Sequence, residues 1–306
     1  MKTLWVEKYR PQTVEEYVFK DSVLRQQVTN WIEEKSIPHL LFSGSPGTGK
    51  TTLAKLLCTA MEVEDADTFY INASRENRVE DMRTKINNFS QTMPWGDFKV
   101  IILDEADYLT PNAQSVLRGL MEEYHTVLRF ILTCNYHNKI LPAINSRCQT
   151  CYIQHLNETD FMVRVGEILA REEIDFNVEL LESFVKASYP DLRKTINNIQ
   201  LNCATGKLAF PEDTDNSQDY KLAMIALFRE GKVKEARKLI CEQIGLEEYE
   251  DVYRFLYRNL DFWGTDDKQD EAILIIRNGL VKHGMIADPE INLSATLIEL
   301  EKLKTG

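Results

Sequence analysis

Residues 44–51 form a phosphate-binding loop, and this short stretch restricts the fold of the chain more than any other part of it. The loop reads Gly-Ser-Pro-Gly-Thr-Gly-Lys-Thr, a complete G-x-x-x-x-G-K-T pattern. The apolar segment 38–43 before it predicts a strand, and residues 52–61 carry apolar side chains at three- and four-residue steps, which predicts a helix. A strand, a glycine-rich loop and a helix in this order are the context in which the pattern binds phosphate.

The residue types in this loop each suit a separate task. The glycines let successive backbone N–H groups point at phosphate oxygens, and the following helix adds the positive end of its dipole. Lys50 is predicted to reach the β- and γ-phosphates, and the Thr51 hydroxyl to bind Mg²⁺. A chance loop that binds nothing is the alternative, and the flanking strand and helix disfavour it. The chain is therefore expected to bind a nucleoside triphosphate.

A second motif indicates hydrolysis. Residues 100–103 are all apolar, as in a parallel strand buried on both faces, and Asp104 and Glu105 follow directly. Asp104 is placed to hold Mg²⁺ through water, and Glu105 to orient or deprotonate the attacking water. Acidic residues also cap ordinary strands, so the pair gains its weight from the phosphate loop about 50 residues earlier.

Length and composition limit the class of protein. A chain of 306 residues suggests two or three domains. The sequence has no apolar run near the ~18–20 residues of a membrane span, and its start lacks the apolar core of a signal peptide, so we expect a cytoplasmic protein without a membrane segment. The six cysteines are scattered, and Cys148 and Cys151 form a lone C-x-x-C without further ligands. Reduced structural thiols are expected, with no metal cage.

The net charge of −12 does not by itself decide whether the chain binds nucleic acid, because the distribution of charge matters more. Arg75, Arg78, Arg83 and Lys85 lie near the start of a predicted helix. Arginines at a helix N-terminus can contact phosphates. An ordinary solvated amphipathic helix is an equal alternative from the residues alone.

The first half of the chain alternates between strand and helix. Strand candidates at 69–72, 100–103 and 129–135 are separated by helical segments, one of which begins at Pro111. Such alternation predicts a doubly wound parallel sheet, whose carboxyl edge faces the nucleotide. Asp104, Glu105 and Asn135 are then expected at the same edge as the phosphate loop.

Beyond residue 153 the pattern is helical only. Three helices are expected first, followed by a polar, acidic linker at 210–217 and about five more amphipathic helices. The predicted domains are an α/β P-loop ATPase core at 1–155, a three-helix lid at 156–210, and an all-helical C-terminal domain at 211–306.

Several motifs in order resemble the AAA+ ATPases of sliding-clamp loaders. Residues 5–11 resemble the opening W-x-E-K-Y-R-P signature of that family. The phosphate loop and acidic strand are followed by Thr-Cys-Asn at 133–135, Ser-Arg-Cys at 146–148 and Asp-Leu-Arg-Lys at 191–194. The chain is most similar to the large subunit of T-even-type phage clamp loaders and to replication factor C small subunits. The resemblance is close over roughly residues 4–205; beyond them it extends only to length and helicity, where it implies a C-terminal collar.

The resemblance implies further catalytic roles. Asn135 corresponds to sensor 1, which holds the attacking water or the γ-phosphate, and Arg193 to sensor 2 on the lid. Arg147 corresponds to the arginine finger, which acts in trans on the nucleotide of a neighbouring subunit. Ordinary caps or surface positions are the alternatives for Asn135 and Arg193, and a local salt bridge is the alternative for Arg147.

It also implies binding and relay residues. Residues corresponding to ATP contacts are Tyr9, Arg10, Pro11, Ser45, Pro46, Gly47, Thr48, Gly49, Lys50, Thr51, Thr52 and Arg193. Gln114 and Arg118 match a relay between the ATP and DNA sides, although a plain amphipathic helix fits them nearly as well. Asn72 matches a position that can hold Glu105 inactive until DNA binds. Arg78 and Arg83 match basic positions that contact template phosphates.

The function implied is that of a clamp-loader ATPase subunit, with ATP and Mg²⁺ as cofactors. Its partners would be sister copies and a divergent loader subunit in a pentamer-like ring or spiral, a sliding clamp, and primer–template DNA. ATP binding would open the clamp, and DNA-triggered hydrolysis would release it closed on DNA. The alternatives are another AAA+ motor, such as a branch-migration helicase or protein unfoldase, and a non-catalytic assembly subunit. The intact catalytic residues argue against the non-catalytic subunit.

Overall fold

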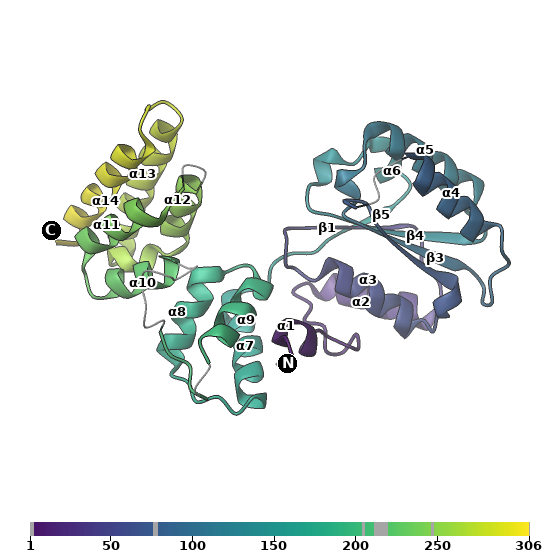
Figure 1. Ribbon diagram of the computed structural model, residues 1–306, viewed down its shortest axis with the longest axis horizontal. Helices are drawn as coiled ribbons and strands as arrows, with labels where there is room; N and C mark the ends of the chain where they lie inside the picture. Colours follow the sequence, from purple (N-terminus) through teal and green to yellow (C-terminus); the bar gives the residue numbers. More distant parts are fainter. Residues whose placement is uncertain (1–2, 76–78, 204–205, 211–219, 246–247, 306) are drawn as a thin grey trace. The chain divides into compact units, whose positions relative to one another are not determined.

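The computed structural model describes residues 3–75, 79–203, 206–210, 220–245 and 248–305 (Figure 1). The chain divides into two compact units, one formed by residues 1–165 and 190–197 and the other by residues 166–189 and 198–306. The first unit contains a β-sheet, and the second is mainly helical. The predicted domain boundaries near residues 155 and 210 stay a prediction.

A five-stranded parallel sheet forms the centre of the first unit. The strands, in chain order, are β1 (Leu40–Ser43), β2 (Thr68–Asn72), β3 (Lys99–Asp104), β4 (Leu128–Cys134) and β5 (Gln149–Tyr152). Their order in the sheet is β2-β3-β4-β1-β5, and every neighbouring pair is parallel. The predicted doubly wound parallel sheet is therefore confirmed.

Helices cover both faces of this sheet, as Figure 1 shows. The helices of this region are α1 (Trp5–Lys8), α2 (Ser22–Glu33), α3 (Lys50–Ala60), α4 (Val79–Ser90), α5 (Pro111–Glu123) and α6 (Pro142–Asn145). Along β3, Val100 and Ile102 belong to the core that includes residues of α2 and α3, whereas Ile101 and Leu103 belong to the core with residues of α4 and α5. Burial on both faces explains why β3 reads as an uninterrupted apolar run.

The register of the strands brings the ends of different motifs to one edge. Ser43, the last residue of β1, lies opposite Cys134 of β4 and Tyr152 of β5. Asn72, the last residue of β2, lies opposite Asp104 of β3. The phosphate loop, the acidic pair and the tip of β4 therefore lie at the carboxyl edge, where open α/β sheets bind ligands.

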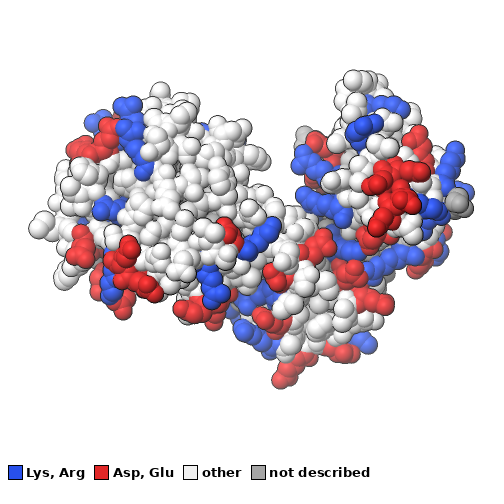
Figure 2. Space-filling model, turned by 180° about the vertical axis from the view of Figure 1, so that it is seen from behind, with Lys and Arg blue, Asp and Glu red and all other residues white. Residues whose placement is uncertain are grey.

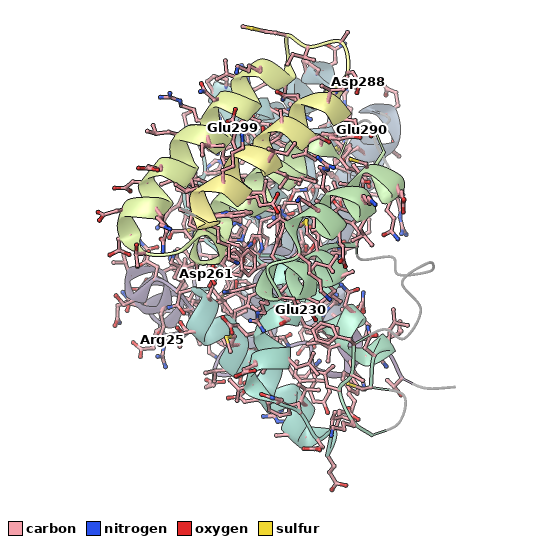
Figure 3. All side chains as sticks on the ribbon, turned by 90° about the vertical axis from the view of Figure 1, so that its left-hand side faces the viewer. Arg25, Glu230, Asp261, Asp288, Glu290 and Glu299 are labelled. Carbon is pink, nitrogen blue, oxygen red and sulfur yellow. The ribbon has the colours of Figure 1, made fainter. Side chains whose placement is uncertain are left out.

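The described residues beyond β5 are mainly helical, as predicted. The helices are α7 (Glu158–Arg171), α8 (Val178–Ser188), α9 (Leu192–Leu201), α10 (Tyr220–Arg229), α11 (Val233–Gln243), α12 (Tyr249–Arg258), α13 (Asp266–His283) and α14 (Pro289–Thr305). The predicted linker at 210–217 lies almost wholly outside the described residues. Figure 3 shows Asp288 just before α14, and Glu290 and Glu299 on that helix.

Candidate nucleotide-binding and hydrolysis site

The phosphate loop connects β1 to α3, and its glycines are required by its geometry. Gly47 and Gly49 have φ of 77° and 87°, a left-handed conformation that residues with a Cβ adopt only at a cost. A Cβ on Gly44 would lie 2.2 Å from the carbonyl oxygen of Ile153. A Cβ on Gly47 would lie 2.6 Å from Oδ1 of Asp191, the residue just before α9. The loop therefore packs closely against both β5 and the start of α9.

Lys50 occupies the centre of the loop and is almost completely buried. Its ammonium group donates to the carbonyl oxygens of Gly44 and Ser45, each at 2.7 Å, and to Oδ1 of Asn135 at 2.8 Å. Burial lowers the pKa of Lys50, while the carboxylate of Asp104 acts in the opposite direction. Three fixed acceptors thus hold a desolvated cation at the position where a phosphate is expected.

Asp104 accepts hydrogen bonds from three hydroxyl groups on three different elements. Thr51 of α3 and Thr133 of β4 donate to Oδ1 at 2.6 and 2.5 Å, and Tyr70 of β2 donates to Oδ2 at 2.7 Å. The carboxylate and the Thr51 hydroxyl supply oxygen ligands of the kind that Mg²⁺ prefers. No group of three or more His, Cys, Asp or Glu side chains suited to a metal occurs among the described residues. Mg²⁺ in proteins usually combines one or two carboxylates with water and substrate phosphates.

Glu105, the residue after Asp104, has a strained backbone conformation. Its φ and ψ are 58° and 42°, which is left-handed and unusual for a residue other than glycine. Its backbone N–H donates to Oγ1 of Thr133 at 3.1 Å, so Thr133 contacts both members of the acidic pair. Strain of this kind costs on the order of 1–3 kcal/mol and is common at functional sites. The turn directs the chain out of the sheet directly after the carboxylate of Asp104.

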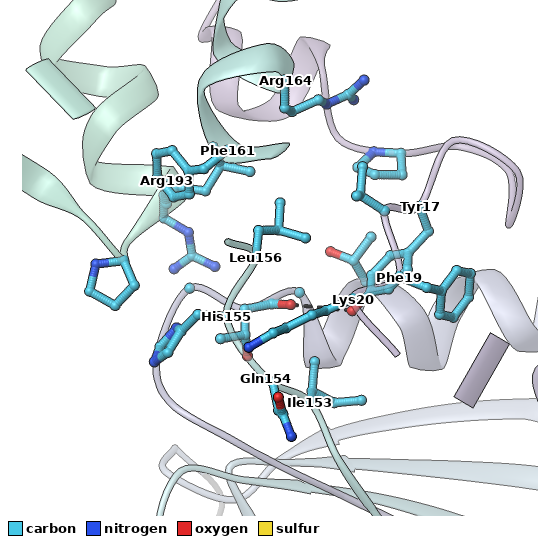
Figure 4. Close-up of a pocket in the computed structure, with 18 of the residues that line it drawn as sticks. Tyr17, Phe19, Lys20, Ile153, Gln154, His155, Leu156, Phe161, Arg164 and Arg193 are labelled. Carbon is cyan, nitrogen blue, oxygen red and sulfur yellow. Dashed lines mark hydrogen bonds between the residues drawn. The ribbon is translucent and has the colours of Figure 1, made fainter. Parts of the chain in front are cut away.

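A pocket beside the loop is lined by the N-terminal segment, β5 and the lid helices (Figure 4). Its volume is about 140 Å³, and all its lining residues belong to the first unit. Apolar and aromatic side chains line much of it, among them Val18, Phe19, Leu24, Ile153, Leu156 and Phe161. Tyr17 donates from its hydroxyl to the carbonyl of Thr48, which joins the pocket wall to the phosphate loop. An apolar pocket next to a phosphate loop suits a nucleotide base.

The N-terminal residues and Arg193 meet at this pocket, although they are far apart in the sequence. Tyr9, Arg10 and Pro11 line it, as do Gly47, Thr48, Gly49 and Thr52 of the loop region. Arg164 of α7 donates to the carbonyl of Tyr9 at 3.1 Å.

Arg193 lines the same pocket from α9, and its charge contributes to the lowered pKa of Lys50. Ser45 lies in the same loop, where its carbonyl accepts from Lys50 and from Thr48. Pro46 follows Ser45.

Arg147 lies at the opposite edge of the sheet. It precedes β5, whose first residue, Gln149, pairs with Leu40 at the start of β1. It lines a cavity together with Pro38 and His39, which precede β1. Its guanidinium forms an ion pair with Glu122 and donates to the carbonyl of Ala143 at 2.6 Å. The four-residue strands separate the two edges by about 13 Å, so the backbone of Arg147 lies far from the phosphate loop of its own chain.

The structure places the proposed relay residues in different settings. Gln114 is buried, and its amide group donates to the carbonyls of Leu109 and Lys139 and accepts from the backbone N–H of Leu141. Arg118 is half exposed, with its Nε 3.8 Å from Oε1 of Glu122.

Two other predicted residues, Asn72 and Arg83, lie on β2 and α4. Oδ1 of Asn72 accepts from Ser74 and from the N–H of Arg75, so it caps the turn after β2. Arg83 is exposed on α4, and Arg78 lies outside the described residues.

Three polar residues at the site were not singled out in the sequence. Tyr70 and Thr133 hold Asp104, and the buried Asp107 accepts from the N–H of Tyr136 at 3.2 Å. Thr133 belongs to the Thr-Cys-Asn motif at 133–135, but only the register places it beside Asp104, because it follows the partner of Leu103. Tyr70 had no local signal, since a tyrosine in a strand usually packs without a polar role.

Known proteins resemble the chain over most of its length. A family model described as "ATPase family associated with various cellular activities (AAA)" matches residues 40–156. The replication factor C small subunit of Methanococcus vannielii is 37% identical over 283 residues, which cover 90% of this chain and 85% of that protein. The corresponding protein of Aeropyrum pernix is 34% identical over 97% of this chain and 95% of its own length.

Solved structures show the same fold. A Thermotoga maritima RuvB Holliday junction branch migration motor matches with a TM-score of 0.55 and 15% identity, over 79% of this chain and 83% of that one. At this identity the likeness concerns the fold alone. In the described part of the chain, the helices are too short or too polar to cross a membrane.

Proposed function

The chain belongs to the replication factor C small subunit family, and from this premise we propose that it is an ATPase subunit of a loader that places sliding clamps on primer–template DNA. The single observation that carries the proposal is the convergence of Lys50, Thr51, Asp104, Glu105 and Asn135 at one edge of the sheet. A non-catalytic subunit has no chemical need for all five. The branch-migration or unfoldase alternative has no better support, since the RuvB likeness concerns the fold alone.

In the proposed site each residue has a task of its own. Lys50 contacts the β- and γ-phosphates, Glu105 orients or deprotonates the attacking water, and Asn135 positions that water or the γ-phosphate. Arg193 brings a fixed positive charge from α9 toward the γ-phosphate. Thr51 and Asp104 would hold Mg²⁺, which when bound neutralises the phosphate charge. The apolar pocket beside Tyr9, Arg10 and Pro11 receives the base.

The proposed arginine finger explains why turnover needs an assembly. Arg147 lies at the amino edge of the sheet, so it can serve only the nucleotide of another copy. Its guanidinium must first leave the ion pair with Glu122 before it can contact a phosphate. Because Arg147 is only half-buried, this change of partner is feasible. An arginine supplied across an interface contributes on the order of 10³–10⁵ to the rate of phosphoryl transfer.

Two surfaces support assembly with sister copies and a divergent subunit into a pentamer-like ring or spiral. Large apolar side chains are exposed on or beside α13 and α14, namely Leu274, Val281, Met285 and Ile291. Exposed apolar surface can mark protein contacts, and on this basis we propose that these helices belong to the collar. The sheet-containing unit also has a broad surface with few charged side chains on the face that Figure 2 shows, which is typical of an interface core.

Contact with primer–template DNA is proposed through phosphates. Arg83 is exposed on α4, where it can face a duplex. Arg78, which lies outside the described residues, is proposed as a second contact from the sequence alone. Such contacts read the shape of the backbone and carry no sequence information. In the proposed cycle, ATP binding holds an open clamp, and DNA then aligns Arg147 with the neighbouring site. Gln114 and Arg118 relay between the ATP and DNA sides, and Asn72 releases Glu105 when DNA binds. Hydrolysis releases the closed clamp.

The test is the steady-state ATPase rate of the assembled loader with and without primer–template DNA and its clamp. DNA and clamp together should stimulate the wild type strongly. Arg147→Ala should keep ATP binding and lose the stimulation, while Arg171→Ala, an exposed arginine at the end of α7, should behave as wild type. Stimulation retained by Arg147→Ala would contradict the finger assignment. A rate raised by DNA but indifferent to any clamp would favour a translocating motor.

A further inference from the structure

Tyr70 makes a contact at the hydrolysis site that none of the sequence motifs predicts. Its hydroxyl donates to Oδ2 of Asp104 at 2.7 Å. Tyr70 lies on the edge strand β2 opposite Ile102, two residues before the position that pairs with Asp104. Two residues along a strand span about 6.6 Å, so only a long side chain at position 70 can bridge this distance.

The contact complements those of the two threonines. Thr51 and Thr133 both donate to Oδ1 of Asp104, whereas Tyr70 donates to Oδ2. Thr51 is the hydroxyl that the phosphate-loop pattern assigns to Mg²⁺, so it is needed elsewhere once ATP and metal bind. The orientation of the carboxylate then depends on Thr133 at one oxygen and Tyr70 at the other.

Tyr70 itself is held in place. The ammonium group of Lys55 on α3 lies 4.8 Å from the centroid of the Tyr70 ring, within the range of a cation–π contact. Burial, together with the hydrogen bond to Asp104, raises the pKa of Tyr70 to about 12. The hydroxyl therefore remains a proton donor throughout the physiological pH range.

We propose that Tyr70 is a positioning residue for the metal that accompanies ATP: by holding Oδ2, it keeps Oδ1 of Asp104 directed at Thr51. The inference rests on the proposed function, because it requires ATP and a divalent cation in this site. Partners that orient a metal-binding carboxylate typically contribute 10- to 100-fold to metal affinity or activity. Because Tyr70 is 41% exposed, we expect the lower end, about 10-fold.

The test uses Tyr70→Phe, which keeps the ring and its contact with Lys55 and removes only the hydroxyl. Electron paramagnetic resonance of Mn²⁺ measures metal affinity in the complex with a non-hydrolysable ATP analogue. A fluorescent ATP analogue in EDTA measures nucleotide affinity without metal. Tyr257→Phe, which removes an exposed hydroxyl from the helical unit, is the matched control.

The expected result is an approximately 10-fold weaker Mn²⁺ affinity in Tyr70→Phe, with unchanged nucleotide affinity in EDTA. The Mg²⁺ concentration for half-maximal ATPase activity should rise in parallel, while the rate at saturating Mg²⁺ changes less. Mn²⁺ affinity within twofold of wild type would overturn the inference but leave the loader proposal intact. An equal loss of metal-free nucleotide binding would show a merely structural role. Failure of the wild type to bind Mn²⁺ with the analogue would overturn both proposals.

Discussion

Lys50 and Asn135, which are 85 residues apart in the sequence, are joined by a hydrogen bond of 2.8 Å between Nζ and Oδ1. Lys50 lies near the end of the phosphate loop and begins α3, and Asn135 directly follows β4. The pairing of β1 with β4 places them together, because Ser43 lies opposite Cys134. The bond couples the residue proposed to contact phosphate to the residue proposed to position the attacking water.

Asn135→Ala should therefore separate ATP binding from hydrolysis. Lys50 keeps two carbonyl acceptors in the loop, so ATP affinity should change only a few-fold. Loss of a polar group that acts on the transition state should lower the hydrolysis rate on the order of 10²-fold. Single-turnover hydrolysis and equilibrium binding of the same variant measure the two effects. A large loss of affinity with normal turnover of bound ATP would contradict the assignment.

Gly47→Ala should weaken ATP binding about 10-fold or more, because the left-handed conformation at φ 77° costs ~1–2 kcal/mol with a Cβ. The new Cβ would also collide with Asp191, 2.6 Å away. Adding Asp191→Ala should restore the share of ATP affinity that is lost through the collision. The share lost through the left-handed backbone conformation should remain. Nucleotide titration of the single and double variants measures both.

Gly119→Ala is the matched control for this substitution. Gly119 lies in α5, where a Cβ would have no neighbouring atom within 4 Å, and it has an ordinary helical φ. Alanine there should raise the free energy of unfolding by roughly 0.5–1 kcal/mol and leave ATP affinity unchanged. Equal affinity losses at positions 47 and 119 would show that the close packing around the phosphate loop is not the cause.

Gln114→Leu should lower the free energy of unfolding by about 2 kcal/mol, because it removes the hydrogen bonds of a buried amide to backbone groups of Leu109, Lys139 and Leu141. Arg118→Ala, on the exposed side of the same helix, should change the free energy of unfolding by no more than about 0.5 kcal/mol from the wild-type value. Urea unfolding of both variants measures this difference. Wild-type stability of Gln114→Leu would mean that its three hydrogen bonds contribute little.

His39 should make the stability of the protein fall in acid. Its ring nitrogen Nδ1 accepts from the N–H of Phe130 at 3.1 Å, and burial, with Arg129 and His125 nearby, lowers its pKa to about 4. The unfolded chain, with a histidine pKa near 6.5, binds more protons between these values. The stability contributed by the neutral ring is therefore complete above pH 6.5 and is lost as the pH falls through 4.

The neutral His39 ring should contribute about 2 kcal/mol to the free energy of unfolding, after allowance for solvent screening of this partly exposed ring. His39→Asn keeps a hydrogen-bond acceptor and removes the titrating group. The difference in free energy of unfolding between wild type and variant should therefore shrink as the pH falls from 6.5 to 4. Denaturant unfolding of both proteins across this pH range measures the free-energy difference, and its value at pH 7.5 is the reference. A constant difference would show that His39 does not titrate in this way.

The sequence by itself determined the parts of this protein that depend on neighbouring residues. The left-handed turns of the phosphate loop need glycines at fixed spacing, so residues 44–51 could be recognised without a structure. The apolar run of β3 predicted a strand buried on both faces, and its acidic end predicted the carboxyl edge. The order of the motifs was enough to indicate the clamp-loader family, which the relatives confirm.

Only the tertiary structure decided which side chains meet. The hydroxyls of Tyr70 and Thr133 contact Asp104 because strand register brings β2, β3 and β4 into line, and register depends on the packing of the whole sheet. The same pairing puts Arg147 at the edge away from its own phosphate loop. Local sequence carries no direct record of these distances, because each is set by elements that lie far apart in the chain and pack around a common core.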